Sequence, residues 1–134
     1  MPDLNQSRDS ATPELDMSHE KLRESPRVVK VRIGCDVESS NGQAVEQYFN
    51  NVLQTEQPRH VLLDLGGVTF GDTAFFSLLL FMKEEVQKGG GRLVLFGVRP
   101  ELHSTLRLLS FDKFLTIKPD QAVSRLAEAV EGAR

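Results

Sequence analysis

Three histidines and one cysteine are the side chains of this chain that could ligate a transition metal. His19, His60 and His103 lie far apart in the sequence, and no two of them stand four residues apart on one helical face. A zinc site needs several such ligands at short spacing, and Cys35 is the single cysteine. A lone cysteine cannot form an internal disulfide either. We therefore expect no metal site, no cofactor, and a reducing compartment, the cytoplasm.

Two further patterns suggest enzyme chemistry, and neither is complete. Asp64 and Asp72 are eight residues apart, but the sequence around them offers no nucleophile or second acid-base group for hydrolysis. The glycines at 89–91 follow a predicted helix and precede a predicted strand, whereas phosphate-binding loops run from strand to helix. We interpret these glycines as a helix stop. The chain is predicted to have no catalytic residues and not to be an enzyme.

Thr73 is the hydroxyl with the most informative position. It follows Asp72 and precedes a helix predicted from Ala74, so its oxygen could cap a free backbone N–H at the helix start. A residue at that position is also exposed, and a phosphate added to it would lie at the favourable end of the helix dipole. Capping and modification both remain open for Thr73, as do bracing the turn and orienting the hydroxyl for Asp72.

The helix that follows is apolar nearly all round, since Ser77 is its one polar residue between positions 74 and 82. If Phe76, Leu79 and Leu80 face a sheet, the remaining large side chains point partly outward, and exposed apolar clusters mark contact surfaces. The alternative is that neighbouring loops or a second copy cover them. The expected partner-binding residues around this helix are Gly71, Ala74, Phe75, Leu78, Phe81 and Met82.

The elements that would position these residues follow from hydrophobic periodicity and turn signals. Strands are predicted at 21–24, 28–33, 60–65 (resuming at 68–70), 92–96 and 114–117. Helices are predicted around 44–53, 74–88, 99–109 (with a stripe of Leu102, Leu106 and Leu109) and from 119 to about 130. The first two strands form a hairpin, and helices join the others. This order predicts an α/β fold with about four helices and a mixed, mostly parallel sheet.

Composition limits the partners. The chain has 134 residues, a formal charge of −3 and no basic cluster, which argues against nucleic-acid binding. It has no apolar run long enough to span a membrane and no secretory signal pattern, so we expect no membrane insertion. Residues 1–19 are mostly polar without apolar periodicity, which predicts a disordered tail before a single domain at 20–131.

One stretch carries a family resemblance. Residues 61–79 combine an apolar strand ending in Asp64 with the loop Val68-Thr69-Phe70-Gly71-Asp72-Thr73, and they resemble the signature of STAS domains, the SpoIIAA-like fold of bacterial anti-sigma factor antagonists. The similarity continues through 88–95, 99–109 and 111–114. It covers about 21–130, and the order of elements predicted above is that of the family.

The chain departs from the family pattern at four places, one of which is Phe81, at a position near the middle of the helix that is often small. Ala74 stands where the loop usually has a second hydroxyl, and Phe75 stands where a glycine usually lets another backbone approach. The Gly-Glu-Leu-Asp turn after the hairpin is represented by Gly34-Cys35-Asp36-Val37. These departures suggest an antagonist with an altered partner.

The resemblance implies a binding protein that works by partner switching. By analogy, Thr73 would be phosphorylated by an anti-sigma factor that carries a histidine-kinase-like ATPase domain, and only the unmodified form would bind that partner. Similar domains also act as accessory subunits on the ATPase of lipid-transport ABC systems, using a threonine at this position without phosphate, or as scaffold subunits in stress signalling. Association into a homodimer is left open.

Overall fold

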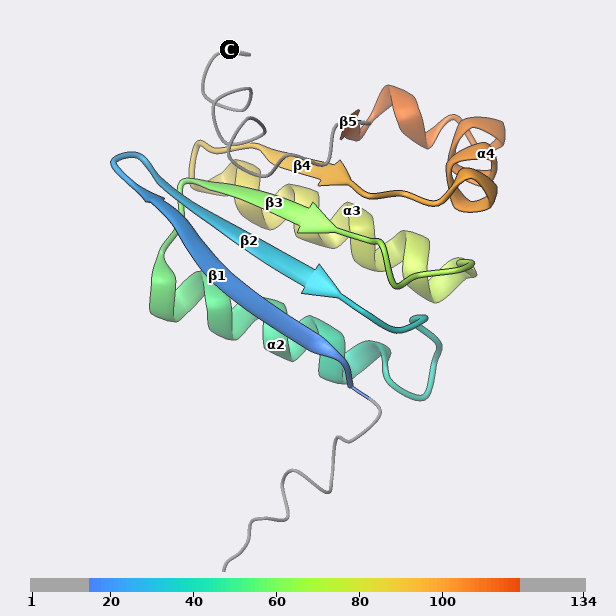
Figure 1. Ribbon diagram of the computed structural model, residues 1–134, viewed down its shortest axis with the longest axis horizontal. Helices are drawn as coiled ribbons and strands as arrows, with labels where there is room; N and C mark the ends of the chain where they lie inside the picture. Colours follow the sequence, from blue (N-terminus) through green and yellow to red (C-terminus); the bar gives the residue numbers. More distant parts are fainter. Residues whose placement is uncertain (1–14, 119–134) are drawn as a thin grey trace, which may run out of the picture.

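The computed structural model describes residues 15–118, which form a mixed sheet with helices against it. Figure 1 shows the arrangement, and the elements in chain order are β1 (Met17–Glu24), β2 (Arg27–Ile33), α2 (Gly42–Glu56), β3 (His60–Asp64), α3 (Thr73–Lys88), β4 (Leu93–Phe96), α4 (Pro100–Leu108), the 3-10 helix η1 (Phe111–Lys113) and β5 (Thr116–Lys118).

The strands lie in the sheet in the order of the sequence, from β1 to β5. β1 and β2 form an antiparallel hairpin, and each later strand adds in parallel to the one before it. The connections from β2 to β3 and from β3 to β4 both move to the next strand in the same direction along the sheet. Right-handed crossovers that move in one direction place their helices on one face, so α2 and α3 cover the same face of the sheet (Figure 1). The predicted α/β fold with a mixed, mostly parallel sheet is confirmed.

Most of the apolar core lies between the sheet and this helical layer. β3 is at the centre of the sheet, and its Val61 and Leu63 pack into the main core while Leu62 faces the opposite side. The alternating Val29, Val31 and Ile33 of β2 join the same core. The nearly continuous apolar run of β3 therefore reflects burial on both faces, as expected of an inner parallel strand.

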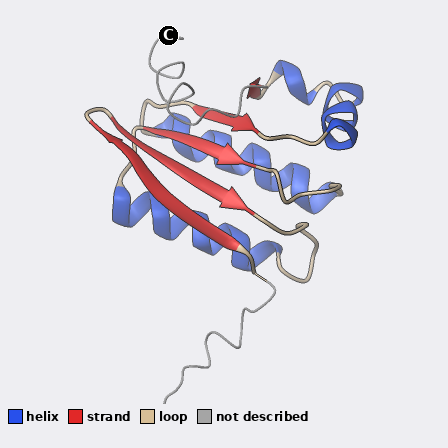
Figure 2. Cartoon of the chain, in the orientation of Figure 1, coloured by secondary structure: helices blue, strands red, loops and turns tan. Residues whose placement is uncertain are grey.

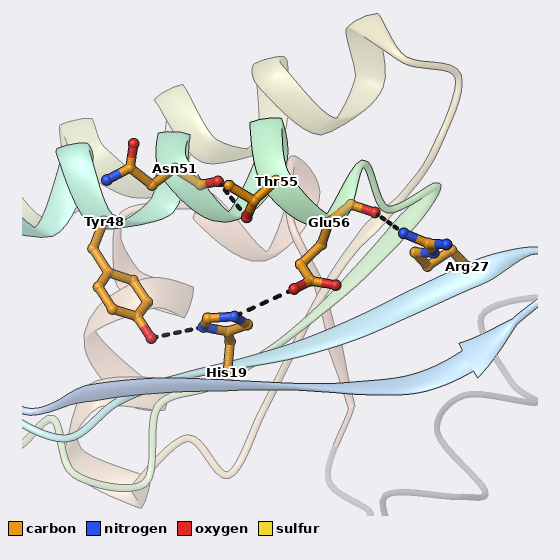
Figure 3. Close-up of polar contacts among 6 residues, drawn as sticks. All are labelled: His19, Arg27, Tyr48, Asn51, Thr55 and Glu56. Carbon is orange, nitrogen blue, oxygen red and sulfur yellow. Dashed lines mark hydrogen bonds and ion pairs between the residues drawn. The ribbon is translucent and has the colours of Figure 1, made fainter.

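Polar contacts attach the edge strand β1 to α2 (Figure 3). His19 of β1 lies between two side chains of α2, with Nδ1 2.7 Å from the Tyr48 hydroxyl and Nε2 3.7 Å from Glu56 Oε2. Arg27 at the start of β2 donates a hydrogen bond of 2.6 Å to the Glu56 backbone oxygen. These contacts attach the hairpin to α2.

The boundaries of several elements differ from the predicted ones. β1 begins at Met17, so the last residues of the expected tail belong to the sheet, where Met17 pairs with Ile33. β3 ends at Asp64, and residues 68–70 form loop rather than a resumed strand. Between α4 and β5, η1 takes up residues that precede a shorter last strand. Strand propensity alone did not predict that β1 starts at Met17, because an edge strand is ordered by hydrogen bonds to its neighbour more than by its own apolar content.

Some predictions fall outside the described residues. The helix expected from 119 and most of the expected tail lie there. Within 15–118, no helix is both long and apolar enough to cross a membrane.

Candidate functional site

The loops that follow β2, β3 and β4 meet at one end of the sheet (Figure 2), as the carboxyl ends of parallel strands must. The β3–α3 loop, residues 65–72, lies between the other two. Its start is fixed on both sides of Gly66: the backbone N–H donates to Asp64 Oδ1 at 2.9 Å, and the carbonyl accepts from Arg99 Nε at 2.9 Å. Asp64 is thus a bracing residue of this turn.

Two glycines let the β2–α2 and β3–α3 loops touch backbone to backbone. A Cβ placed on Gly67 would overlap the backbone of Gly34, including its Cα and carbonyl groups. The absence of side chains at this contact brings the two loops together, and a backbone neighbour cannot move aside as the end of a flexible side chain can.

Asp36 joins the same two loops through its carboxylate. Oδ1 accepts hydrogen bonds from the backbone N–H groups of Thr69 at 2.6 Å and Phe70 at 3.4 Å, and Oδ2 accepts from the Thr69 hydroxyl at 2.7 Å. Partial burial alone would raise the pKa of Asp36, but its hydrogen bonds and the positive charge of Arg99 outweigh that effect and hold the pKa below its usual value. The carboxylate is therefore ionised in the folded protein near neutral pH.

Asp72, rather than Thr73, caps the start of α3. Asp72 has extended backbone angles, and its Oδ1 accepts a hydrogen bond of 3.2 Å from the N–H of Phe75. The helix begins at Thr73, so of the two roles left open for the Thr73 hydroxyl, capping is excluded. The carboxylate takes this role because it is one residue earlier and negatively charged beside the positive end of the helix dipole. Thr73 is exposed.

The predicted orientation of α3 is wrong as well. Phe75 and Met82 have no exposed surface and Leu78 is 5% exposed, although all three were expected to point partly outward. The buried stripe runs through 75, 78, 79, 82 and 86, a helical period displaced from the expected 76, 79 and 80. α3 packs against both the sheet and α2, which buries a wider arc than a single contact would. Phe75 and Met82 belong to the core, and Leu78 belongs to the core while its edge also reaches the surface groove described below.

Gly71 provides the room that Phe75 requires. A Cβ on Gly71 would overlap the Phe75 ring, so the phenyl group lies directly under the loop backbone. Since this ring points inward, it does not stand between Thr73 and an approaching protein. The substitution of phenylalanine for the family's glycine is therefore accommodated inside the molecule.

A groove of about 510 Å³ runs between α2 and the exposed side of α3. Of the residues expected to bind a partner, Ala74, Leu78 and Phe81 line it; Ala74 and Phe81 are half-buried, and Leu78 is 5% exposed. The other lining residues are Ser39, Gly42, Gln43, Glu46 and Ser77. The groove begins one residue after Thr73 and extends the accessible surface along the helix.

The other apolar side of α3 is covered by the segment after α4. Phe76, which was expected to face the sheet, packs against Phe111 of η1 with ring centroids 5.3 Å apart. Leu109, predicted in the buried stripe of its helix, is 48% exposed because α4 ends one residue before it.

Phe70 is the site residue that sequence reasoning did not single out for binding. Its side chain is 52% exposed, in the middle of the β3–α3 loop and three residues before Thr73. The signal was present, because an aromatic residue stood in a loop between polar residues and glycine. Asp36 was also missed, and its signal was an acidic residue placed shortly after a parallel strand.

The histidines do not come together. His60 is buried, and its Nδ1 accepts a hydrogen bond of 3.1 Å from the backbone N–H of Arg92, while His19 contacts α2. Among residues 15–118, no group of three or more histidine, cysteine or acidic side chains could hold a metal ion.

Comparison with known proteins gives a consistent picture. The model of the STAS domain family matches residues 20–123. An anti-sigma F factor antagonist of Paenibacillus polymyxa is 24% identical over 101 residues, which cover 75% of this chain and 86% of the relative.

Solved structures share the fold at low sequence identity. A candidate anti-sigma factor antagonist of Thermotoga maritima has a TM-score of 0.74 at 16% identity and covers 86% of this chain and 94% of its own. The anti-sigma factor antagonist SpoIIAA in its unphosphorylated form has a TM-score of 0.66 at 15% identity and covers 87% of this chain and 99% of its own. A structure of SpoIIAA in its phosphorylated form is also similar, with a TM-score of 0.56.

Proposed function

The chain belongs to the STAS domain family, and on this premise we propose that it is an anti-sigma factor antagonist that acts in the cytoplasm by partner switching. Its partner is an anti-sigma factor with a histidine-kinase-like ATPase domain, which binds the unmodified chain and phosphorylates Thr73. The chain itself contributes a binding surface and no catalysis.

The observation that carries this proposal is the exposure of Thr73 at the first residue of α3, with accessible apolar surface on both sides of it. Phe70 is half-exposed in the preceding loop, and the groove lined by Ala74 and Phe81 follows along the helix. A protein that lands on this surface covers the hydroxyl. A kinase that binds here therefore has its acceptor group within the contact.

A phosphate on Thr73 would be tolerated by the free chain and not by the complex. At the start of α3 the added charge of about −1.5 to −2 meets the positive end of the helix dipole and open solvent. In a complex the same charge would have to be desolvated against the partner and would also lie beside the carboxylate of Asp72. Modification therefore weakens binding without unfolding the antagonist.

The relatives support this direction. The Paenibacillus relative is named an anti-sigma F factor antagonist, and SpoIIAA is known in unphosphorylated and phosphorylated forms. The burial of Phe75 supports it too, because the surface next to Thr73 is not blocked by the bulky side chain that replaces the family's glycine.

Phosphosite mapping tests the proposal. The chain is incubated with ATP and a lysate of its source organism and analysed by mass spectrometry, with Ser104→Ala as a control for an exposed hydroxyl on α4. We expect phosphate on Thr73, loss of partner capture after modification, retained capture by Thr73→Ala and weakened capture by Thr73→Asp. A chain that captures its anti-sigma factor but accepts no phosphate on Thr73 contradicts the switch.

The two rival functions predict other results in the same experiment. An accessory subunit of a lipid-transport ABC system would copurify with a transport ATPase, carry no phosphate and lose binding in Thr73→Ala. A scaffold subunit in stress signalling would elute from a size-exclusion column as a large assembly. The elution volume of the purified chain on the same column shows whether it forms a homodimer.

A further inference from the structure

The β3–α3 loop holds an aromatic side chain in water. Phe70 is 52% exposed, although the main core is close enough to bury Phe75 under the same loop. Leaving a phenyl ring in water is unfavourable in the free protein, because its apolar surface is not buried. Rigid aromatic side chains are also among the residues that contribute most to binding at protein interfaces. The question is what keeps this ring outside.

The contacts of Asp36 answer it. Its carboxylate accepts hydrogen bonds from both N–H groups of residues 69 and 70 and from the Thr69 hydroxyl, so the backbone that carries the phenyl ring is fixed directly before its Cα. Asp36 itself is on the β2–α2 loop, which touches the β3–α3 loop through Gly34 and Gly67. The ring is thus held out by a second loop and not by its own.

We propose that Phe70 is the aromatic anchor of the partner interface and that Asp36 is the positioning residue that presents it. The inference rests on the proposed function, since the partner is the anti-sigma factor that also meets Thr73. Its contact surface carries an apolar pocket that receives the phenyl ring. Holding the ring in its bound position before association removes part of the ordering cost of binding.

The surroundings of Phe70 indicate the chemistry of the rim of that pocket. Asp72 and Glu38 are exposed acidic residues on the two loops, and Asp36 is ionised, whereas Arg99 already donates to the loop carbonyl of Gly66. Charged rims set association rate and orientation more than affinity. We therefore expect lysine or arginine side chains around the apolar pocket of the anti-sigma factor.

Equilibrium binding of four proteins tests the anchor and its positioning together. The wild type, Phe70→Ala, Asp36→Ala and the double variant are titrated with each purified anti-sigma factor of the source organism. Phe70→Ala is expected to raise Kd by about 30-fold, as loss of an interface hot spot does. Asp36→Ala is expected to raise Kd by about tenfold, and the double variant is expected to bind no more weakly than Phe70→Ala alone, because Asp36 acts through the ring.

Three matched variants separate positioning from general damage. Phe114→Ala removes a phenyl ring of similar exposure, 56%, from another part of the surface, and Glu38→Ala removes a charge from the same loop as Asp36 without touching the hydrogen bonds. Phe114→Ala should leave Kd within about twofold, the size of typical surface effects, whereas Glu38→Ala, at the charged rim, should act mainly on the association rate and leave the Asp36 hydrogen bonds intact. Asp36→Asn keeps an acceptor oxygen and should restore most of the affinity lost in Asp36→Ala.

The outcomes distinguish this inference from the proposed function. If the wild type binds and Phe70→Ala binds equally well, the anchor is refuted while the antagonist role stands. If the effects of Asp36→Ala and Phe70→Ala multiply, Asp36 is a structural residue and the positioning role is refuted. If no anti-sigma factor binds the wild type, the proposed function fails, and hydrogen exchange at the amides of 69 and 70 still tests whether Asp36→Ala releases the loop.

Discussion

Gly71 and Phe75 should be energetically coupled, and the coupling can be worked out from the contact between them. In Gly71→Ala the new methyl group would overlap the Phe75 ring, which is completely buried and cannot swing into solvent. Overpacking of this kind costs about 1–3 kcal/mol. Gly71 does not have a positive φ, so the backbone conformation itself accepts alanine.

The cost should disappear when the ring is removed. Phe75→Ala alone lowers the free energy of unfolding by about 3–5 kcal/mol, as for other buried phenylalanines. In that background the methyl group added by Gly71→Ala enters the vacated space, and replacing glycine now stabilises by about 0.4–1 kcal/mol through the unfolded state. The double variant is therefore expected to be at least as stable as Phe75→Ala, with a coupling energy of about 1–4 kcal/mol.

Urea unfolding of the four proteins, followed by far-UV circular dichroism, measures the coupling. Gly89→Ala serves as a control, because the nearest atom to its new Cβ is 3.7 Å away at Val86 O. If Phe75→Ala does not fold, Phe75→Leu removes part of the ring and replaces it in the cycle. Additive effects within about 0.5 kcal/mol would refute the idea that the glycine exists to make room for the ring.

Three further predictions use the same unfolding assay. Asp72→Ala should lose about 0.5–2 kcal/mol and Asp72→Asn much less, while Thr73→Ala should change stability by under about 0.5 kcal/mol; equal losses at 72 and 73 would contradict the capping assignment. Gly67→Ala should cost about 1–3 kcal/mol against a negligible cost for Gly89→Ala, because its new methyl group meets another backbone. The pKa of Asp36 in the folded protein is lowered from 3.8, so the ionised carboxylate stabilises the fold above about pH 4, and this stabilisation is lost as the pH falls through the pKa of the folded state. The difference in free energy of unfolding between wild type and Asp36→Ala should be constant from about pH 7 to about 5 and shrink only below about 4.

The sequence predicted the fold well because its strands and helices are separated by clear punctuation. Periodicity placed β2, β3, α2 and α3, and the order of elements then left few topologies. What it could not place were features that depend on neighbours. β1 is ordered by pairing with β2. The rotation of α3 about its own axis is set by its packing against both the sheet and α2.

The exposure of Thr73 was predicted from the sequence, and the contacts around it were not. The exposed Thr73 after Asp72 follows from helix-start chemistry, which acts over three or four residues. The contact between Asp36 and Thr69 joins residues 33 positions apart, and no local pattern encodes it. The same holds for Gly34 and Gly67, whose importance appears only when two loops meet.

The apolar character of α3 first suggested that the helix itself was the contact surface, and its packing is the reason for proposing the loop before it instead. α3 meets the sheet and α2 through its buried stripe, and η1 through Phe76, so most of its apolar residues are accounted for within the chain. Phe70, Thr73 and the groove at Phe81 remain accessible. Substitutions inside the stripe should therefore reduce stability, and Phe70→Ala, which removes an exposed ring of the loop, should reduce binding at nearly unchanged stability. A variant such as Leu79→Ala that weakened binding while unfolding at the wild-type urea concentration would show that the helix face, and not the loop, meets the partner.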